Sequence, residues 1–166
     1  MAEREIRLFG DPILRSPTDP IDPAGERAKG LVEDLLDTVR VPGRAGVAAN
    51  QIGVGLRAFS YNVDGHVGYI LNPVLVSVEG EAELVDEGCL SVPGLSYPRL
   101  RHPRATVTGQ LLDGSEITLS GEGLLAQALQ HECDHLDGHL YIEGLEPEVK
   151  REAMAAIRAS DWFQLP

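Results

Sequence analysis

The stretch SGEGLLAQALQHECDHLDG, residues 120–138, combines a predicted helix with the most informative motif of the chain. Ser120 is a residue type that often caps the start of a helix and Gly138 one that often ends it, so we predict a helix over Glu122–Asp137. Within it stands His131-Glu132-Cys133-Asp134-His135, the pattern H-E-x-x-H. Four residues make about one helical turn, so both imidazoles should project from one face.

The spacing of His131 and His135 predicts a metal site. Two imidazoles on one helix face can share one ion, and Glu132 is rotated only partly away, toward the same cavity. Cys133 follows His131 by two residues, about 200° around the helix, so we interpret it as a core residue rather than a ligand. At this point the metal could be structural or catalytic, because both kinds of site need a further ligand.

We expect the third ligand upstream of the helix. The metzincin extension of the motif fails because Tyr141 stands where its third histidine belongs, and the short remainder of the chain leaves little room for a thermolysin-like glutamate. Upstream, EGCLS (residues 87–91) offers Cys89 after a run typical of a strand. Cysteine with two histidines leaves a fourth position open for water, which is the pattern of a catalytic zinc-type site.

A third segment, GVAANQ (residues 46–51), follows the first predicted helix. Its small side chains allow another backbone to come close, and the Gln51 amide can donate a hydrogen bond to a developing oxyanion. On the H-E-x-x-H helix, the side chains that precede His131 by seven, four and three residues should share its face and border the cavity. These residues are Leu124, Gln127 and Ala128.

The rest of the chain indicates an α+β fold in one domain, residues 1–166, with no repeat or low-complexity linker. Helices are predicted over Glu26–Arg40 and Pro147–Ser160, near the two ends. Turn dipeptides between them predict antiparallel hairpins, so the sheets should surround the central helix that carries H-E-x-x-H. The expected strand pairs are 56–63 with 66–71, 74–78 with 81–86, and 105–112 with 115–120.

Composition restricts the kinds of partner. With 14 Lys and Arg against 26 Asp and Glu, the formal net charge is −12, which argues against duplex nucleic acid as a ligand. The basic cluster RLRHPR, residues 99–104, is interpreted as a solvated strand edge. The sequence has no run of 18 apolar residues, so no membrane span is predicted, and the charged N-terminus does not resemble a signal peptide. We therefore expect a cytoplasmic protein, with both cysteines reduced.

Taken together, GVAANQ, EGCLS and QHECDHLDG, in this order and at these separations, resemble the peptide deformylase family of bacteria. These enzymes remove the formyl group from the N-terminal methionine of new chains. The resemblance covers nearly the whole chain, from FGDPILR near the start to the C-terminal helix. One departure is Arg44, which occupies the first glycine position of the family pattern Gly-x-Gly-x-Ala-Ala-x-Gln, with Gly43 displaced by one residue.

The resemblance implies a role for each motif. It implies a divalent metal held by Cys89, His131 and His135, with Glu132 as general base and acid. It also implies that Gln51 and the backbone N–H of Leu90 form the oxyanion site. The metal implied in cells is Fe²⁺, although the Cys and two His donors also tolerate Zn²⁺, Ni²⁺ or Co²⁺.

The implied substrate is the N-formyl-methionyl end of a nascent peptide. An extended peptide would pair with backbone near Gly46 and Val47 and near Gly88, while Gln127 and Ala128 border its methionine side chain. Transient contact with the ribosome stays open, since no basic tail favours it. Two alternatives remain: a zinc peptidase that cuts internal amides, and a noncatalytic module stapled by its metal. No spare Cys or His stands near the motifs to close the site, which favours catalysis.

Overall fold

The computed structural model describes residues 2–164 and has the predicted α+β class. Met1, Leu165 and Pro166 of the predicted domain lie outside the described residues. The helices are α1 (Glu26–Val39), α2 (Gly123–Leu136), α3 (Pro147–Ala159) and α4 (Asp161–Gln164), with short 3-10 turns η1 (Pro12–Arg15), η2 (Ala49–Ile52) and η3 (Tyr141–Gly144). The strands are β1 (Gly46–Ala48), β2 (Ala58–Val63), β3 (His66–Glu79), β4 (Glu83–Cys89), β5 (Val92–Arg101), β6 (Arg104–Gln110) and β7 (Glu116–Glu122).

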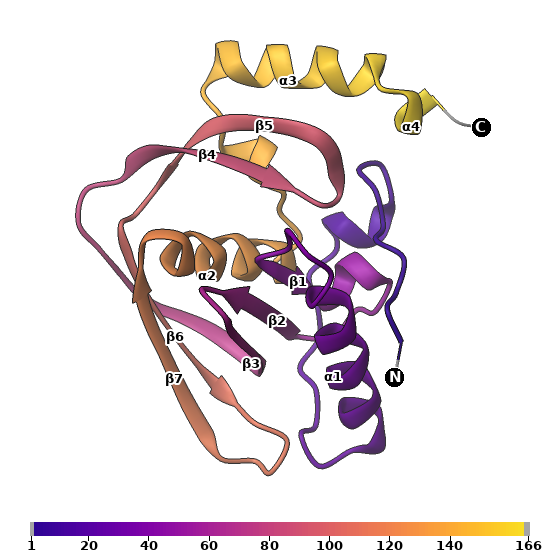
Figure 1. Cartoon of the computed structure of the whole chain (residues 1–166), viewed down its shortest axis with the longest axis vertical. Coiled ribbons are helices and arrows are strands. Elements are labelled where there is room, and N and C mark those ends of the chain that lie inside the picture. The colour runs from indigo at the N-terminus through magenta and orange to yellow at the C-terminus, as the bar shows by residue number, and fades with distance from the viewer. Residues whose placement is uncertain (1, 165–166) are drawn as a thin grey trace.

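The strands form two antiparallel sheets. One has five strands in the order β1-β2-β3-β6-β7, and the other is the hairpin β4-β5. Figure 1 shows α2, which carries the H-E-x-x-H motif, between the β4-β5 hairpin and the larger sheet. α1 packs beside β1 and β2, and α3 lies against β5. This arrangement brings the end of β4 and the start of β1 to α2 from opposite sides.

Two of the three predicted hairpins are confirmed, namely β2 with β3 and β6 with β7. The predicted pairing of 74–78 with 81–86 is wrong. The second half of β3 continues along β6, with Val78 opposite Ala105, while β4 pairs with β5, with Gly88 opposite Ser96. The turn at Gly80, whose φ is +83°, sends the chain to the second sheet instead of back along β3. A turn dipeptide shows that the chain reverses but not which strand it then joins.

The stretch VPGLSYP, residues 92–98, belongs to strand β5. Pro93 and Pro98 both lie inside this strand. Proline is tolerated here because β5 has only one neighbour, so the side without a partner needs no N–H donors.

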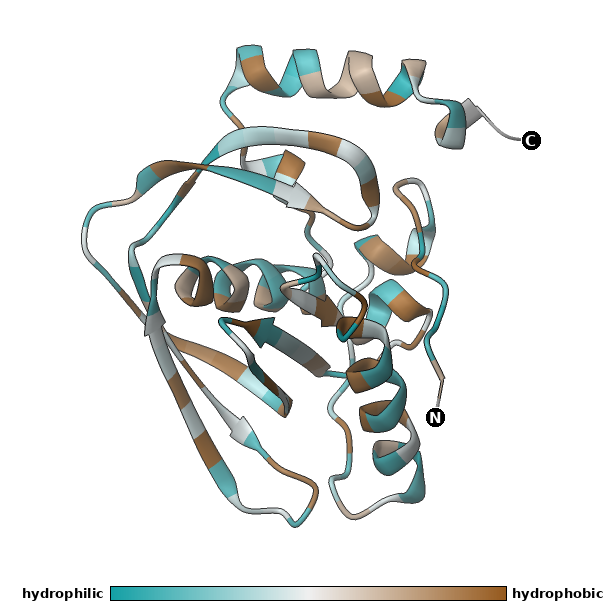
Figure 2. Ribbon diagram, viewed as in Figure 1, coloured by the Kyte–Doolittle hydropathy of each residue, from teal (hydrophilic) through white to brown (hydrophobic). Residues whose placement is uncertain are grey.

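Apolar stripes place α1 and α2 against the large sheet. On α1 the apolar stripe at helical spacing consists of buried Leu31, Val32, Leu35 and Val39 and partly buried Leu36. On α2 the stripe that faces the sheet consists of Ala126, Leu129, Cys133 and Leu136. Figure 2 shows the same division, with brown and teal faces along the helices. The opposite face of α2 is left for the histidines.

Specific contacts hold α2 at its C-terminal end, whereas its N-cap residue makes no side-chain capping hydrogen bond. Its N-cap is Glu122 and not Ser120, which lies in β7. Gly138 ends the helix with φ +86°, and a Cβ there would lie 2.9 Å from the Arg15 carbonyl, so only glycine fits. The backbone N–H and the hydroxyl of Thr18 both donate to the carbonyl of Leu136. The N-terminal arm therefore fixes the end of the helix that carries the motif.

Within residues 2–164, no helix has the length and apolar character needed to cross a membrane.

Candidate metal centre and active site

Three side chains meet where the end of β4 approaches α2. Cys89 is the last residue of β4, and its Sγ lies 3.3 Å from His135 Nε2. His131 Nε2 lies 3.1 Å from the same His135 nitrogen. The donor atoms of the three residues all lie within 4.8 Å of one another, and both histidines are buried. The structure therefore brings together the three predicted ligands.

The two histidines have surroundings that suit a metal. The other ring nitrogen of His131, Nδ1, lies 2.7 Å from Glu87 Oε2, which leaves Nε2 directed at the cluster. Burial, with the charge of His131 beside it, lowers the pKa of His135 well below its usual value. A neutral imidazole is the form that binds a metal, and His135 is in that form. Burial alone would lower the pKa of His131, but Glu132, Cys89 and Glu87 raise it well above its usual value, so a metal would displace a proton from His131. One thiol and two imidazoles are a donor set that fits a divalent ion.

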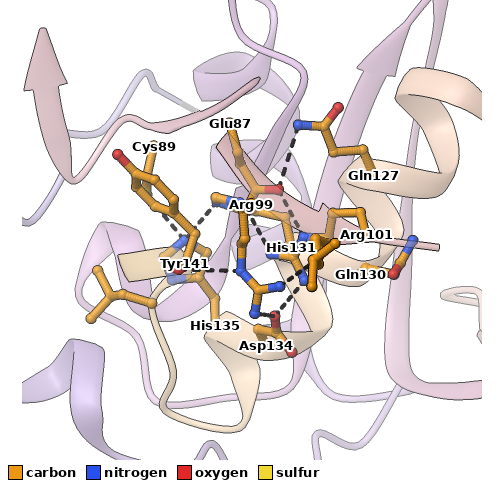
Figure 3. A network of polar contacts seen from close by, with 12 residues as sticks. Glu87, Cys89, Arg99, Arg101, Gln127, Gln130, His131, Asp134, His135 and Tyr141 are labelled. Atoms are coloured by element: carbon orange, nitrogen blue, oxygen red, sulfur yellow. Dashed lines mark hydrogen bonds and ion pairs between the residues drawn. The ribbon is translucent and has the colours of Figure 1, made fainter. Parts of the chain in front are cut away.

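Glu87 links the cluster to a buried ion-pair network (Figure 3). Arg101 donates to both of its carboxylate oxygens, at 2.6 and 2.7 Å, and also to Asp134 at 2.8 Å. Burial alone would raise the pKa of Glu87, but hydrogen bonds from Arg101 and His131 hold it at about 2. Glu87 is thus an ionised acceptor at neutral pH.

This network corrects the interpretation of residues 99–104 as a solvated edge. Only 6% of Arg101 is exposed, and Arg99 donates to the Tyr141 carbonyl. Arg104, by contrast, is exposed and pairs with Glu79 on the surface. Arg99 and Arg101 are two residues apart on β5 and so share its inner face, whereas Leu100 between them points outward and is exposed, and Arg104 belongs to β6.

Glu132 lies buried beside the cluster, with 3% of its surface exposed. Its Oε1 has no hydrogen-bond partner within the described residues. Burial raises the pKa of Glu132 to about 7, against the opposing charge of His131. Gly46 packs against it so closely that a Cβ would lie 2.6 Å from Oε2. A buried carboxylate with a pKa near neutrality can both accept and return a proton.

Hydrogen bonds to Ala48 and Ser91 hold the Gln51 side chain next to Cys89. Its Oε1 accepts the Ala48 N–H at 3.0 Å, and its Nε2 donates to Ser91 Oγ at 3.1 Å and points to Cys89 Sγ at 3.7 Å. Because Oε1 is occupied by backbone, the amide can present only N–H groups toward the cluster. Leu90, the next residue after Cys89, begins the turn between β4 and β5.

A hollow of about 380 Å³ opens over these groups. The predicted site residues that line it are Gly46, Gln51, Gly88, Cys89, Leu90, Leu124, Gln127, Ala128, His131 and Glu132. Val47 does not line the hollow, and its side chain is fully buried in the core beneath α1, so the pairing of a peptide with backbone near it stays a prediction. Gln127 also donates to the Asp86 carbonyl at 3.0 Å, which ties α2 to β4 across one wall.

Sequence reasoning missed Glu87, Ser91 and Asn50 as supports of the site. Asn50 donates to the His135 carbonyl from the turn η2. Glu87 could have been found, because residues two apart on a strand share a face and Glu87 stands two before Cys89. Ser91 and Asn50 gave no signal of their own, since their contacts depend on how β5 and η2 pack.

The fold and the site together define a class, that of metal-dependent hydrolases with a buried carboxylate beside a Cys-His-His donor set. Comparison with known proteins narrows this class. A family model described as polypeptide deformylase matches residues 3–151. The chain is 49% identical to a peptide deformylase of Acidothermus cellulolyticus, over 98% of this chain and 89% of the relative. It is 46% identical to that of Parafrankia sp., over 100% and 91%.

Comparison with solved structures finds the same family of proteins. The peptide deformylase of Thermus thermophilus is 39% identical, with a TM-score of 0.85 over 94% of this chain and 93% of the other. That of Ehrlichia chaffeensis, in complex with actinonin, is 29% identical with a TM-score of 0.86, over 97% and 99%. The chain belongs to the polypeptide deformylase family.

Proposed function

We propose that this chain hydrolyses the formyl group from the N-terminal methionine of newly made peptides and releases formate. One observation carries the proposal: the Cys89, His131 and His135 donor atoms lie within 4.8 Å of one another, beside buried Glu132, at the base of an open hollow. Membership of the deformylase family supports the same reaction.

Cys89, His131 and His135 would hold one divalent ion. When bound, such an ion lowers the pKa of a water molecule toward about 7 and polarises the carbonyl under attack. We propose Fe²⁺ as the ion in cells, with Zn²⁺, Ni²⁺ and Co²⁺ as substitutes that the same donors accept. Glu87 would orient His131 through Nδ1, at 2.7 Å, and so fix which nitrogen faces the ion.

Glu132 would act as general base and then as general acid. It takes a proton from the attacking water as the new C–O bond forms at the formyl carbon. It then returns a proton to the leaving amine as the C–N bond breaks. Its pKa of about 7 suits both transfers near neutral pH.

The Gln51 amide and the Leu90 N–H would stabilise the negative charge on the formyl oxygen. Gln51 is 1% exposed and its Oε1 is held by the Ala48 N–H, so the amide is already oriented with Nε2 toward the cluster. Ser91, which now accepts from Gln51, lies next to Leu90 on the same turn.

The peptide would bind along the free edge of β1. The Asn62 N–H already uses the Ala45 carbonyl, so by alternation the backbone groups of Gly46 point away from β2. Gly46 is therefore the residue we propose to pair with the peptide on one side, with Gly88 on the other. Leu124, Gln127 and Ala128 would border its methionine side chain.

We also propose that residues 1–166 form one catalytic domain that works in the cytoplasm, where formylated chains are made. The family match over residues 3–151 supports a single domain. The net charge of −12 supports the prediction that duplex nucleic acid is not a partner. Transient contact with the ribosome remains a prediction.

Formate release from a formyl-Met-Ala-Ser peptide, with the metal measured on the same sample, tests the proposal. Glu132→Gln should keep its fold and metal while formate release falls by about a hundredfold or more. A metal-stapled module would load metal without releasing formate. A peptidase would cut an acetyl-blocked peptide at an internal bond, and either result would overturn the proposal.

A further inference from the structure

Arg44 stands at the mouth of the hollow, at a position where the family pattern has glycine. It is half-buried, and its Nη1 donates to the Thr38 carbonyl at 2.9 Å, near the end of α1. A guanidinium has five N–H donors, so most of them remain available. Across residues 2–164, the ion pairs join other cations to carboxylates, and none includes Arg44.

The electrostatic setting makes this cation unusual. Among the described residues that line the hollow, Arg44 alone carries a lysine or arginine charge. Asp86, Glu87 and Glu132 line it as well, and Arg101 neutralises Glu87 from behind. The chain as a whole has a net charge of −12, so its long-range field repels acidic peptides.

The geometry of β1 indicates which part of a peptide passes Arg44. Gly46 lies against Glu132 and so marks the reacting end. Beyond it in one direction, Val47 and Ala48 are fully buried, which closes that route. In the other direction Ala45, Arg44 and Gly43 line the hollow. A peptide with its formyl end beside Gly46 therefore leaves past Arg44, two residues or about 7 Å away.

We propose that Arg44 is a specificity-determining residue that favours formyl-methionyl peptides with an acidic side chain at one of the two positions after methionine. This inference rests on the proposed deformylase activity. The arginine supplies an attractive contact beside the proposed path of the substrate, within a protein whose net charge is −12.

The test compares kcat/KM for C-terminally amidated formyl-Met-Ala-Glu, formyl-Met-Glu-Ala and their Gln and Lys counterparts. The amide caps leave the side chain as the only variable charge. Wild-type protein should prefer at least one Glu peptide over its Gln counterpart by about two- to fivefold, mainly through KM. The preference should shrink in about 1 M salt, where the screening length is about 3 Å.

Arg44→Gln should remove the preference, so that each Glu peptide and its Gln counterpart have equal kcat/KM, while Arg44→Lys should restore part of the preference. Arg40→Gln is the matched control. Arg40 caps the C-terminal end of α1, the helix that Arg44 contacts, and it pairs with Asp37 but does not line the hollow. Equal rates on all peptides in wild type, a preference that persists in Arg44→Gln, or an equal loss in Arg40→Gln would each overturn the inference. Failure to deformylate any peptide would instead overturn the proposed function.

Discussion

Glu87 Oε2 lies 2.7 Å from His131 Nδ1, and the same carboxylate accepts hydrogen bonds from Nε and Nη2 of Arg101. One buried acid therefore sets the orientation of an imidazole that we propose as a metal ligand, and it neutralises a buried cation. The site and the β4-β5 hairpin share this support, so a change at Glu87 should affect both.

Glu87→Ala should destabilise the protein by about 3–5 kcal/mol, because Arg101 would stay buried without its partner. It should also weaken metal binding by about ten- to a hundredfold. Denaturant unfolding and metal titration measure the two effects. Glu79→Ala is the control, since its pair with Arg104 is exposed and should contribute no more than about 1 kcal/mol. Equal losses in both variants would contradict the role given to Glu87.

Removal of any proposed ligand should abolish metal binding. Cys89→Ala, His131→Ala and His135→Ala should each lose most of the metal found in wild type by elemental analysis. Cys133→Ala should keep it, because Cys133 packs against the sheet and burial raises the pKa of its thiol to about 12. A fully loaded Cys89→Ala protein would show that the third ligand is another residue.

Gln51→Ala should lower kcat by about a hundred- to a thousandfold with little change in metal content, since it removes a donor to the developing charge. Gln130→Ala is a suitable control. Gln130 is another buried glutamine. Its side-chain amide forms hydrogen bonds with the backbone of His102 and Ala126, and it does not line the hollow. If both variants lost kcat equally, the effect of Gln51 would be structural.

Gly46→Ala should lower kcat by about a hundredfold, because the added methyl would lie 2.6 Å from Glu132 Oε2 and displace the carboxylate. Gly30→Ala provides the comparison. Gly30 lies exposed in α1 with open space around its Cα, so alanine there should stabilise the protein by about 0.4–1 kcal/mol and leave activity unchanged. Steady-state kinetics measure the change in kcat, and thermal melts measure the change in stability. A fully active Gly46→Ala protein would contradict the proposed close contact between Gly46 and Glu132.

Local periodicity made the H-E-x-x-H geometry predictable. The helical repeat alone puts His131 and His135 on one face and Cys133 on the other, and the structure has that arrangement. It could not show that β3 pairs with β6 or that Arg101 is buried, because strand pairing depends on residues far apart in the chain. The role of Glu87 could not be predicted for the same reason, because its partners Arg101 and His131 come from β5 and α2.

The contact between Thr18 and Leu136 joins residues 118 positions apart in the chain. Because α2 follows every strand in the chain, Cys89 and Gln51 leave the ribosome well before the histidines that complete their site. The site therefore assembles late during synthesis, and contacts of such long sequence separation make folding slow. A truncated chain that stops before Gly123 would lack both the histidine helix and the Leu136 carbonyl that holds its own N-terminal arm.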